Sequence, residues 1–158
     1  MTSLKSLEIE LDCVKQTTMK GINALTEVLK KMVLVRDLLL NLSANSFITS
    51  QGFSDLCSSI KCLKDLAYLD LDLSLGLSMN SKNAEELAET LRSLDSLEIF
   101  HFNCREVWRV GNRQEIFQTL FEVLQKKEKI QDVILTLGER LDPPEALKFN
   151  QSTNFSLY

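Results

Sequence analysis

The chain has 158 residues, of which 44% are hydrophobic and 25% are charged, and its formal net charge is −4. This length and composition fit one globular domain with a continuous core, and they exclude a chain that is disordered over most of its length. The acidic balance disfavours a nucleic-acid partner, no stretch is apolar for long enough to span a membrane, and the N-terminus lacks the basic and apolar regions of a secretory signal.

The first predicted element is an apolar pattern that begins at Leu4 and returns every 31 residues. Apolar and polar residues alternate within it, as they do in a strand with one buried face. The predicted strands carry the patterns Leu4-x-x-Leu7-x-Ile9-x-Leu11, Val35-x-x-Leu38-x-Leu40-x-Leu42, Leu66-x-x-Leu69-x-Leu71-x-Leu73, Leu97-x-x-Phe100-x-Phe102-x-Cys104 and, after a gap of 33, Ile130-x-x-Val133-x-Leu135-x-Leu137.

A second apolar pattern follows each of the first four strands, with spacings of three and then four residues. These spacings place the apolar side chains on one face of a helix. Ser50, Ser81 and Asn83 are the expected caps near the helix starts. The apolar helix positions are Ile22, Leu25 and Leu29; Phe53, Leu56 and Ile60; Ala84, Leu87 and Leu91; and Phe117, Leu120 and Leu124.

Repeated strand–helix–strand crossovers predict an α/β solenoid, in which a parallel sheet lines the concave side of an arc and helices cover the convex side. We expect residues 1–138 to form this solenoid, with about four full repeats and a final strand. Residues 139–158 leave the pattern, and we expect them to form a C-terminal capping segment or a docking tail.

The stretch LLLNLSANSFITSQGFSDL, residues 38 to 56, resembles a leucine-rich repeat of the ribonuclease-inhibitor-like type. The resemblance covers roughly residues 4 to 137 and implies a short horseshoe arc. It implies little about function, because this repeat serves many unrelated partners. The family often places an asparagine shortly after the strand, where its side chain satisfies backbone groups of the loop, and Asn45 takes that place in the second unit.

The polar strand positions are expected to line the concave face. Seven acidic residues and two bases lie at these positions, which predicts either an acidic groove for a basic segment of a partner protein or a solvated face that only has to be polar. Leu39, Tyr68 and Ile134 favour a contact surface, since they are apolar where solvent would otherwise be. The candidate contact residues here are Glu8, Glu10, Asp37, Leu39, Tyr68, Asp70, Asp72, His101 and Arg105.

The connection after the fourth strand departs from the repeat. It is two residues longer than the other connections, and it contains the single tryptophan, Trp108, among Arg105, Arg109 and Arg113. Tryptophan and arginine are typical of binding hot spots. The alternative is that Trp108 folds inward and fills the longer loop while the arginines stay solvated.

Both ends need an account. No polar capping unit precedes Leu4, so we expect a partner, a second copy or further sequence to cover the N-terminal sheet edge. At the other end, Asp142-Pro143-Pro144-Glu145 is expected to end the last strand and to begin a short helix through Phe149. The final QSTNFSLY would fray alone, or fold back as a cap, or dock on a neighbour.

Motifs of catalysis are missing from the sequence. It has no glycine-rich phosphate loop, no G-x-S-x-G elbow, no H-E-x-x-H and no C-x-x-C. The four cysteines are expected to be reduced thiols in the cytoplasm. The single histidine, His101, is interpreted as a polar surface residue. The sequence therefore predicts no catalytic, cofactor or metal site, and a protein that is not an enzyme.

We therefore expect a protein-interaction module, a scaffold or accessory subunit of a larger assembly. The variety of repeat resembles that of cytoskeletal and ciliary proteins. One alternative is a regulator, an inhibitor or a modulator of a GTPase, that covers a basic protein surface with its acidic concave face. Another is the sensor part of a larger enzyme.

Overall fold

Strands and helices alternate along the chain. The computed structural model describes residues 3–12, 19–45, 48–76, 79–105, 113–137 and 153–158. The strands are β1 (Ser6–Glu10), β2 (Asp37–Asn41), β3 (Tyr68–Asp72), β4 (Ile99–Asn103), β5 (Asp132–Thr136) and β6 (Asn154–Leu157). The helices are α1 (Met19–Leu29), α2 (Ser50–Ile60), α3 (Ser81–Arg92) and α4 (Arg113–Leu124).

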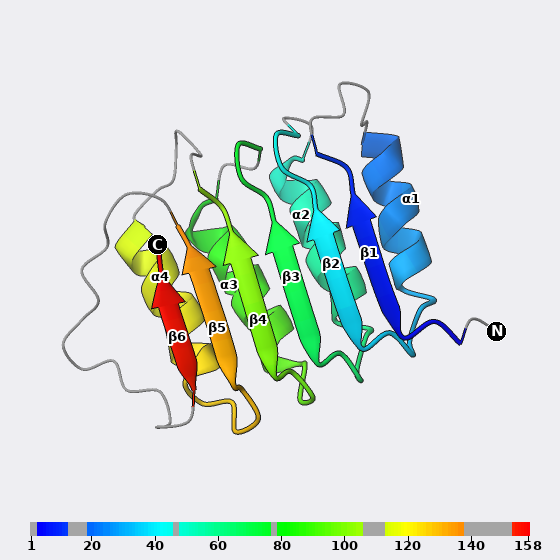
Figure 1. Ribbon diagram of the computed structural model, residues 1–158. Helices are drawn as coiled ribbons and strands as arrows, with labels where there is room; N and C mark the ends of the chain where they lie inside the picture. Colours follow the sequence, from blue (N-terminus) through cyan, green and yellow to red (C-terminus); the bar gives the residue numbers. More distant parts are fainter. Residues whose placement is uncertain (1–2, 13–18, 46–47, 77–78, 106–112, 138–152) are drawn as a thin grey trace.

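The six described strands form one parallel sheet whose order is the order of the chain (Figure 1). The helices lie together on one face of this sheet and leave the other face open (Figure 1). The alternation of strands and helices and the parallel sheet, both predicted from the repeat, are confirmed. The horseshoe curvature and the ribonuclease-inhibitor-like type of repeat stay predictions.

Residues one repeat apart lie opposite each other in the sheet. Leu7 pairs with Leu38, Leu38 with Leu69, and Leu69 with Phe100. Leu38, Leu69 and Phe100 are fully buried beneath the helices. Since side chains alternate between the two faces of a strand, a register that brings these residues together also brings every polar position together on the open face.

Two helices begin at side-chain caps. The Thr49 hydroxyl accepts a hydrogen bond from the Gly52 amide at 3.1 Å, and the Asn80 side-chain oxygen accepts one from the Asn83 amide at 2.9 Å. The caps expected at Ser50, Ser81 and Asn83 are therefore wrong. The capping residue precedes the helical dihedral angles, so it lies just before the first residue of the helix.

The turn after β2 is held by Asn45, as expected for a leucine-rich repeat. Its buried side-chain nitrogen donates to the carbonyl oxygens of Leu11 at 2.6 Å, Leu42 at 3.1 Å and Ser43 at 3.2 Å. The next turn packs directly on it, because a Cβ atom at Gly76 would lie 2.9 Å from the Asn45 carbonyl oxygen. The Asn45 amide thus connects the turns of the first two units, and the missing side chain of Gly76 lets the turn of the third unit pack against them.

The end of the chain adds a strand. β6 pairs with β5, and the Tyr158 amide donates to the Leu135 carbonyl at 2.9 Å. The Phe155 ring lies 6.3 Å from the Phe117 ring and 6.0 Å from the Phe121 ring, measured between centroids. β6 therefore extends the sheet and covers the apolar side of α4. The helix expected from Asp142 to Phe149 lies outside the described residues.

Candidate interaction surface

We call the strand side chains that point away from the helices the open face. They form three rows that cross the sheet, because each of β1 to β5 contributes one residue to each row and β6 contributes one to each of the first two. The first row holds Ser6, Asp37, Tyr68, Ile99, Asp132 and Asn154; the second holds Glu8, Leu39, Asp70, His101, Ile134 and Ser156; the third holds Glu10, Asn41, Asp72, Asn103 and Thr136.

The carboxylates of the open face are kept apart from one another. Within the described register, each acid lies opposite an uncharged residue or His101, and never opposite another acid. Like charges directly opposite on neighbouring strands would destabilise the sheet. The arrangement therefore gives a negative field over the whole face without a repulsive pair in any row.

The most elaborate group on the open face is the His101 cluster, which consists of Tyr68, Asp70, His101 and Asp132 from three strands. The His101 Nε2 atom lies 3.0 Å from an Asp132 carboxylate oxygen, and its Nδ1 atom lies 3.5 Å from Asp70 and 3.4 Å from the Tyr68 hydroxyl. The Tyr68 ring meets the imidazole edge to face, with centroids 5.5 Å apart. The ring of His101 is thus held between two carboxylates.

The Tyr68 hydroxyl is part of the same network. It donates to an Asp70 carboxylate oxygen at 3.2 Å. Burial raises the pKa of Tyr68 above its ordinary value, and the negative charge of Asp70 raises it further, so the hydroxyl stays a hydrogen-bond donor. The cluster presents carboxylate oxygens and an aromatic ring together, which suits a cationic side chain.

The interpretation of His101 as a polar surface residue did not include its two carboxylate neighbours. Asp70 and Asp132 each lie 31 residues from it, so the carboxylates that bracket the ring are distant in the sequence and adjacent in the sheet. The 31-residue period could have found Asp70, which lies directly opposite His101, whereas Asp132 lies diagonally to it, because the fourth unit is 33 residues long. The part of the chain that the structure describes holds no group of three histidine, cysteine or acidic side chains that could bind a metal ion.

The acids of the face differ in how free they are. The Asp72 carboxylate accepts from the Ser74 amide at 2.8 Å, from the Ser74 hydroxyl at 2.6 Å and from the Asn103 side chain at 2.9 Å. Glu8 and Glu10 make no side-chain hydrogen bond or ion pair with other described residues. Asp72 therefore holds the turn after β3, whereas Glu8 and Glu10 stay available to a partner.

Glu8 and Glu10, together with two acids that are held by hydrogen bonds, line a hollow in the open face. This hollow of about 210 Å³ lies over β1, β2 and β3, and Leu39 forms part of its floor. Glu8, Glu10, Asp70 and Asp72 line it. It offers an apolar surface ringed by negative charge, which is the shape that the stem and head of a lysine or arginine side chain fill.

Only some of the candidate contact residues around the connection after β4 belong to the described residues. Trp108 and Arg109 lie outside the described residues. Arg105 is exposed just after β4, and its amide donates to the Asn103 side-chain oxygen at 3.1 Å. Arg113 is the first residue of α4. The two described arginines thus stand at the two ends of residues 106–112.

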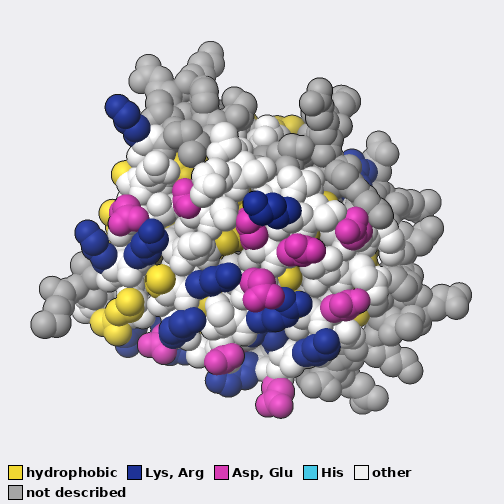
Figure 2. Space-filling model, turned by 180° about the vertical axis from the view of Figure 1, so that it is seen from behind, with side chains coloured by type: hydrophobic (Ala, Val, Ile, Leu, Met, Phe, Trp, Pro, Cys, Tyr) yellow, Lys and Arg dark blue, Asp and Glu magenta, His cyan; other side chains and the backbone are white. Residues whose placement is uncertain are grey.

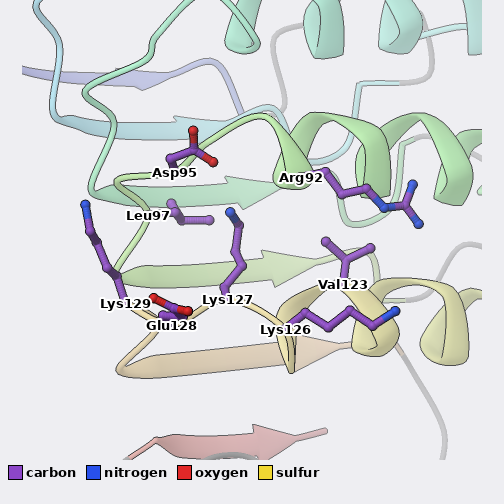
Figure 3. A pocket seen from close by; sticks show the side chains of 8 residues that line it. All are labelled: Arg92, Asp95, Leu97, Val123, Lys126, Lys127, Glu128 and Lys129. Atoms are coloured by element: carbon purple, nitrogen blue, oxygen red, sulfur yellow. The ribbon is translucent and has the colours of Figure 1, made fainter.

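The helix-covered face has a different character. Figure 2 shows basic and acidic side chains interspersed over it. A hollow of about 470 Å³ lies there between the C-terminal ends of α3 and α4, and Arg92, Lys126 and Lys129 line it together with Asp95 and Glu128 (Figure 3).

The bases of that hollow are explained by the helix ends. The Lys127 side chain donates to the Leu94 carbonyl at 2.7 Å, and burial lowers its pKa. Lysine and arginine are favoured near helix C-termini, where carbonyl groups lack partners and the dipole is negative. The same dipole opposes a bound anion, so we regard this hollow as a consequence of the fold.

Comparison with known proteins gives a similar solved structure. The chain shares its fold with the actin-binding site 2 of leiomodin-1. The match to this leiomodin-1 structure has a TM-score of 0.60 and 15% sequence identity, and it covers 80% of this chain and 68% of the leiomodin-1 chain.

No protein-family model and no curated protein matches the sequence. At 15% identity, the likeness to leiomodin-1 shows a leucine-rich-repeat-like fold and leaves function to be argued from the chain itself. None of the four described helices has both the length and the hydropathy needed to cross a membrane.

Proposed function

We propose that the chain is a non-enzymatic protein-interaction module whose open face receives a basic segment of a partner protein. The observation that carries this proposal is the arrangement of six carboxylates on the open face, where Glu8 and Glu10 have no side-chain partner among the described residues and line the hollow beside Leu39. Charge complementarity of this kind steers association and selects partners. Leu39, Tyr68 and Ile134 supply apolar contact area on the same face.

The proposed setting is a scaffold or accessory subunit of a larger cytoplasmic assembly, of cytoskeletal or ciliary type. The name of the leiomodin-1 structure states that this domain binds actin, so actin is the first defined partner to test. The connection with Trp108, Arg109 and the flanking Arg105 and Arg113 is proposed as a second contact region. A partner or second copy is proposed to cover the N-terminal sheet edge.

The acidic face also supports a second candidate function. A regulator, such as an inhibitor or a modulator of a GTPase, would cover a basic surface of its target with the same carboxylates. The two functions predict complexes of different lifetimes. A subunit stays with its assembly through purification, whereas a regulator exchanges with a free pool.

The proposal is tested by zero-length carbodiimide crosslinking of the tagged chain in its native source, followed by mass spectrometry. This reagent joins a carboxylate directly to a lysine that touches it. We expect crosslinks from partner lysines to Glu8, Glu10, Asp70 or Asp132. The same preparation should be probed with purified actin, and co-sedimentation with filaments would make actin the partner.

Matched variants locate the contact. Replacing Asp70 and Asp132 by asparagine keeps side chains of the same shape beside His101 and removes two charges, so partner binding should weaken about tenfold. The control replaces Glu85 and Glu122, two exposed acids on the helices, by glutamine and should leave binding unchanged. Equal binding by both variants, or crosslinks confined to helix carboxylates, would refute a contact through the open face.

A further inference from the structure

The first unit of the solenoid is less buried than its repeats. Leu4 is 40% exposed, whereas Val35 and Leu66, one and two repeats later, are fully buried. Leu7, Ile9 and Leu11 are only partly buried, whereas their equivalents Leu38, Leu40 and Leu42 are inaccessible to solvent. Each of these positions needs a neighbour on the side of β1 that faces away from β2.

Helix α1 shows the same deficit. Val28 is 46% exposed, whereas its equivalents Ser59 and Thr90 are fully buried. Thr90 is buried because the preceding helix lies against it, and its hydroxyl approaches the Cys57 carbonyl of that helix at 3.5 Å. A Cβ atom on Gly21 would meet no atom within 4 Å. The flank of α1 therefore has the composition of a helix–helix contact, and no described helix covers it.

The backbone of β1 specifies how this side would be filled. The amides of Arg36 and Asp37 both donate to the Lys5 carbonyl, and those of Ala67 and Tyr68 both donate to the Arg36 carbonyl. By the repeat, the amides of Lys5 and Ser6 point to the same place on the outer side of β1.

An acceptor is predicted at the other end of β1 in the same way. The Leu11 amide donates to the Asn41 carbonyl at 2.8 Å, and the Leu42 amide donates to the Asp72 carbonyl at 2.8 Å. The equivalent carbonyl in β1 is that of Glu10, and among the described strands none lies on that side. A strand parallel to β1 would satisfy both ends of this ladder.

Charge decides what kind of strand fits. Glu8 and Glu10 are the open-face side chains of β1, and Asp12 follows them. Two copies that paired through their β1 edges would bring these acids together, which is unfavourable. The β6 edge of a second copy presents Asn154 and Ser156, which are uncharged, and no described helix follows β6 to cover Val28. A strand with basic residues on this face has neither defect.

We infer that the outer side of β1 and α1 is the docking site for a strand–helix segment of a partner protein, whose strand alternates apolar with basic residues and adds in parallel to β1. This inference rests on the proposed function and names the segment that the module receives at this edge. The apolar residues of the incoming strand would cover Leu7 and Ile9, its basic residues would lie beside Glu8 and Glu10, and its helix would cover Val28.

The test uses the full chain and three short synthetic peptides of the same length, in which valine alternates with lysine, with glutamate or with serine. Amide hydrogen exchange is followed by NMR. In the free chain, the Lys5 and Ser6 amides should exchange faster than the bonded amides of Arg36 and Asp37. The valine–lysine peptide should slow exchange at Lys5 and Ser6, and the valine–glutamate peptide should not.

Variants of the chain make the test specific. Glu8→Lys combined with Glu10→Lys should weaken binding of the valine–lysine peptide about tenfold and should create binding of the valine–glutamate peptide. Glu85→Lys combined with Glu122→Lys changes the net charge equally on the helices and should alter neither. A serine peptide that binds as well as the lysine peptide would overturn the role assigned to charge.

Two further results would overturn the inference. One is fast exchange at Lys5 and Ser6 with a saturating valine–lysine peptide. The other is protection of these amides in the free chain that disappears on dilution, which would make a second copy the occupant. If crosslinks to Asp70 and Asp132 persist in either case, the open face still binds a partner and only the edge proposal fails. If those crosslinks are lost while the valine–lysine peptide still binds at β1, the edge proposal stands and the contact through the open face fails.

Discussion

At the scale of single residues, the buried side-chain amide of Asn45 links the turns of two successive units. Its nitrogen serves three carbonyl groups from two successive units, although an amide has only two hydrogens, so the contacts are shared among them. Asn83 is a useful contrast. Its side-chain amide is equally buried, yet neither its nitrogen nor its oxygen has a partner among the described residues.

We predict that Asn45→Ala lowers the free energy of unfolding by about 2 kcal/mol, because it leaves buried carbonyls without donors. Urea unfolding measures this. Asn83→Ala is the matched control, and it should cost clearly less, since it removes a buried amide that lacks partners. Equal losses in the two variants would mean that size alone, and not hydrogen bonding, decides the effect.

Residue-level interpretation of the sequence fell short where contacts span repeats. The acids of the open face were visible in the sequence, because alternation alone assigns them to a face. The bracketing of His101 by Asp70 and Asp132 was missed, because it depends on the registers between β3, β4 and β5. The caps at Thr49 and Asn80 each lie one residue before an expected cap, because several polar residues stand together at each helix start.

At the scale of elements, the sequence pattern predicts the five repeated strands but not the last strand, β6. The first five strands follow a period, so spacing alone predicts them. The start of β6 lies 22 residues after the start of β5, outside that period, and the only apolar residues of β6 are Phe155 and Leu157. What fixes this strand is the apolar side of α4, where Phe117 and Phe121 meet Phe155.

Phe155→Ala should therefore release β6. We expect a loss of about 2 kcal/mol in the free energy of unfolding, less than for a fully buried phenylalanine, because the ring is only partly covered. Exchange at the Leu137 amide, which donates to the Tyr158 carbonyl at 2.9 Å, should become faster. Tyr158→Ala is the control, since that side chain is 68% exposed, and it should change stability little. Unchanged exchange at Leu137 in the Phe155 variant would contradict this role.

At the scale of the whole molecule, the core sets how stability depends on pH. Burial raises the pKa of Cys57 and of Cys104 from an ordinary value of 9.0 to about 12. Both thiols bind their protons more tightly in the folded chain, so their contribution is complete below about pH 9 and is lost as the pH rises towards 12. Burial also raises the pKa of Tyr68 and adds to this loss, whereas the lowered pKa of Lys127 opposes it.

We predict that the urea midpoint falls progressively between about pH 9 and about pH 11. Replacing Cys57 and Cys104 together by alanine should flatten this dependence, whatever it does to the stability at neutral pH. Cys62→Ala is the control, because that thiol is partly exposed, and it should keep the original slope. A double variant with an unchanged slope would show that the alkaline loss arises elsewhere.

The register of the sheet also sets a spacing rule for any ligand that crosses the strands. In the second row the acids Glu8 and Asp70 are two strands apart, and in the third row so are Glu10 and Asp72. Neighbouring strands lie about 4.8 Å apart, so successive acids in a row are separated by about 10 Å. An extended peptide advances about 3.3 Å per residue. A polypeptide lying across the strands would therefore match these rows with a lysine or arginine at about every third residue, a periodicity that can be searched for in candidate partner sequences.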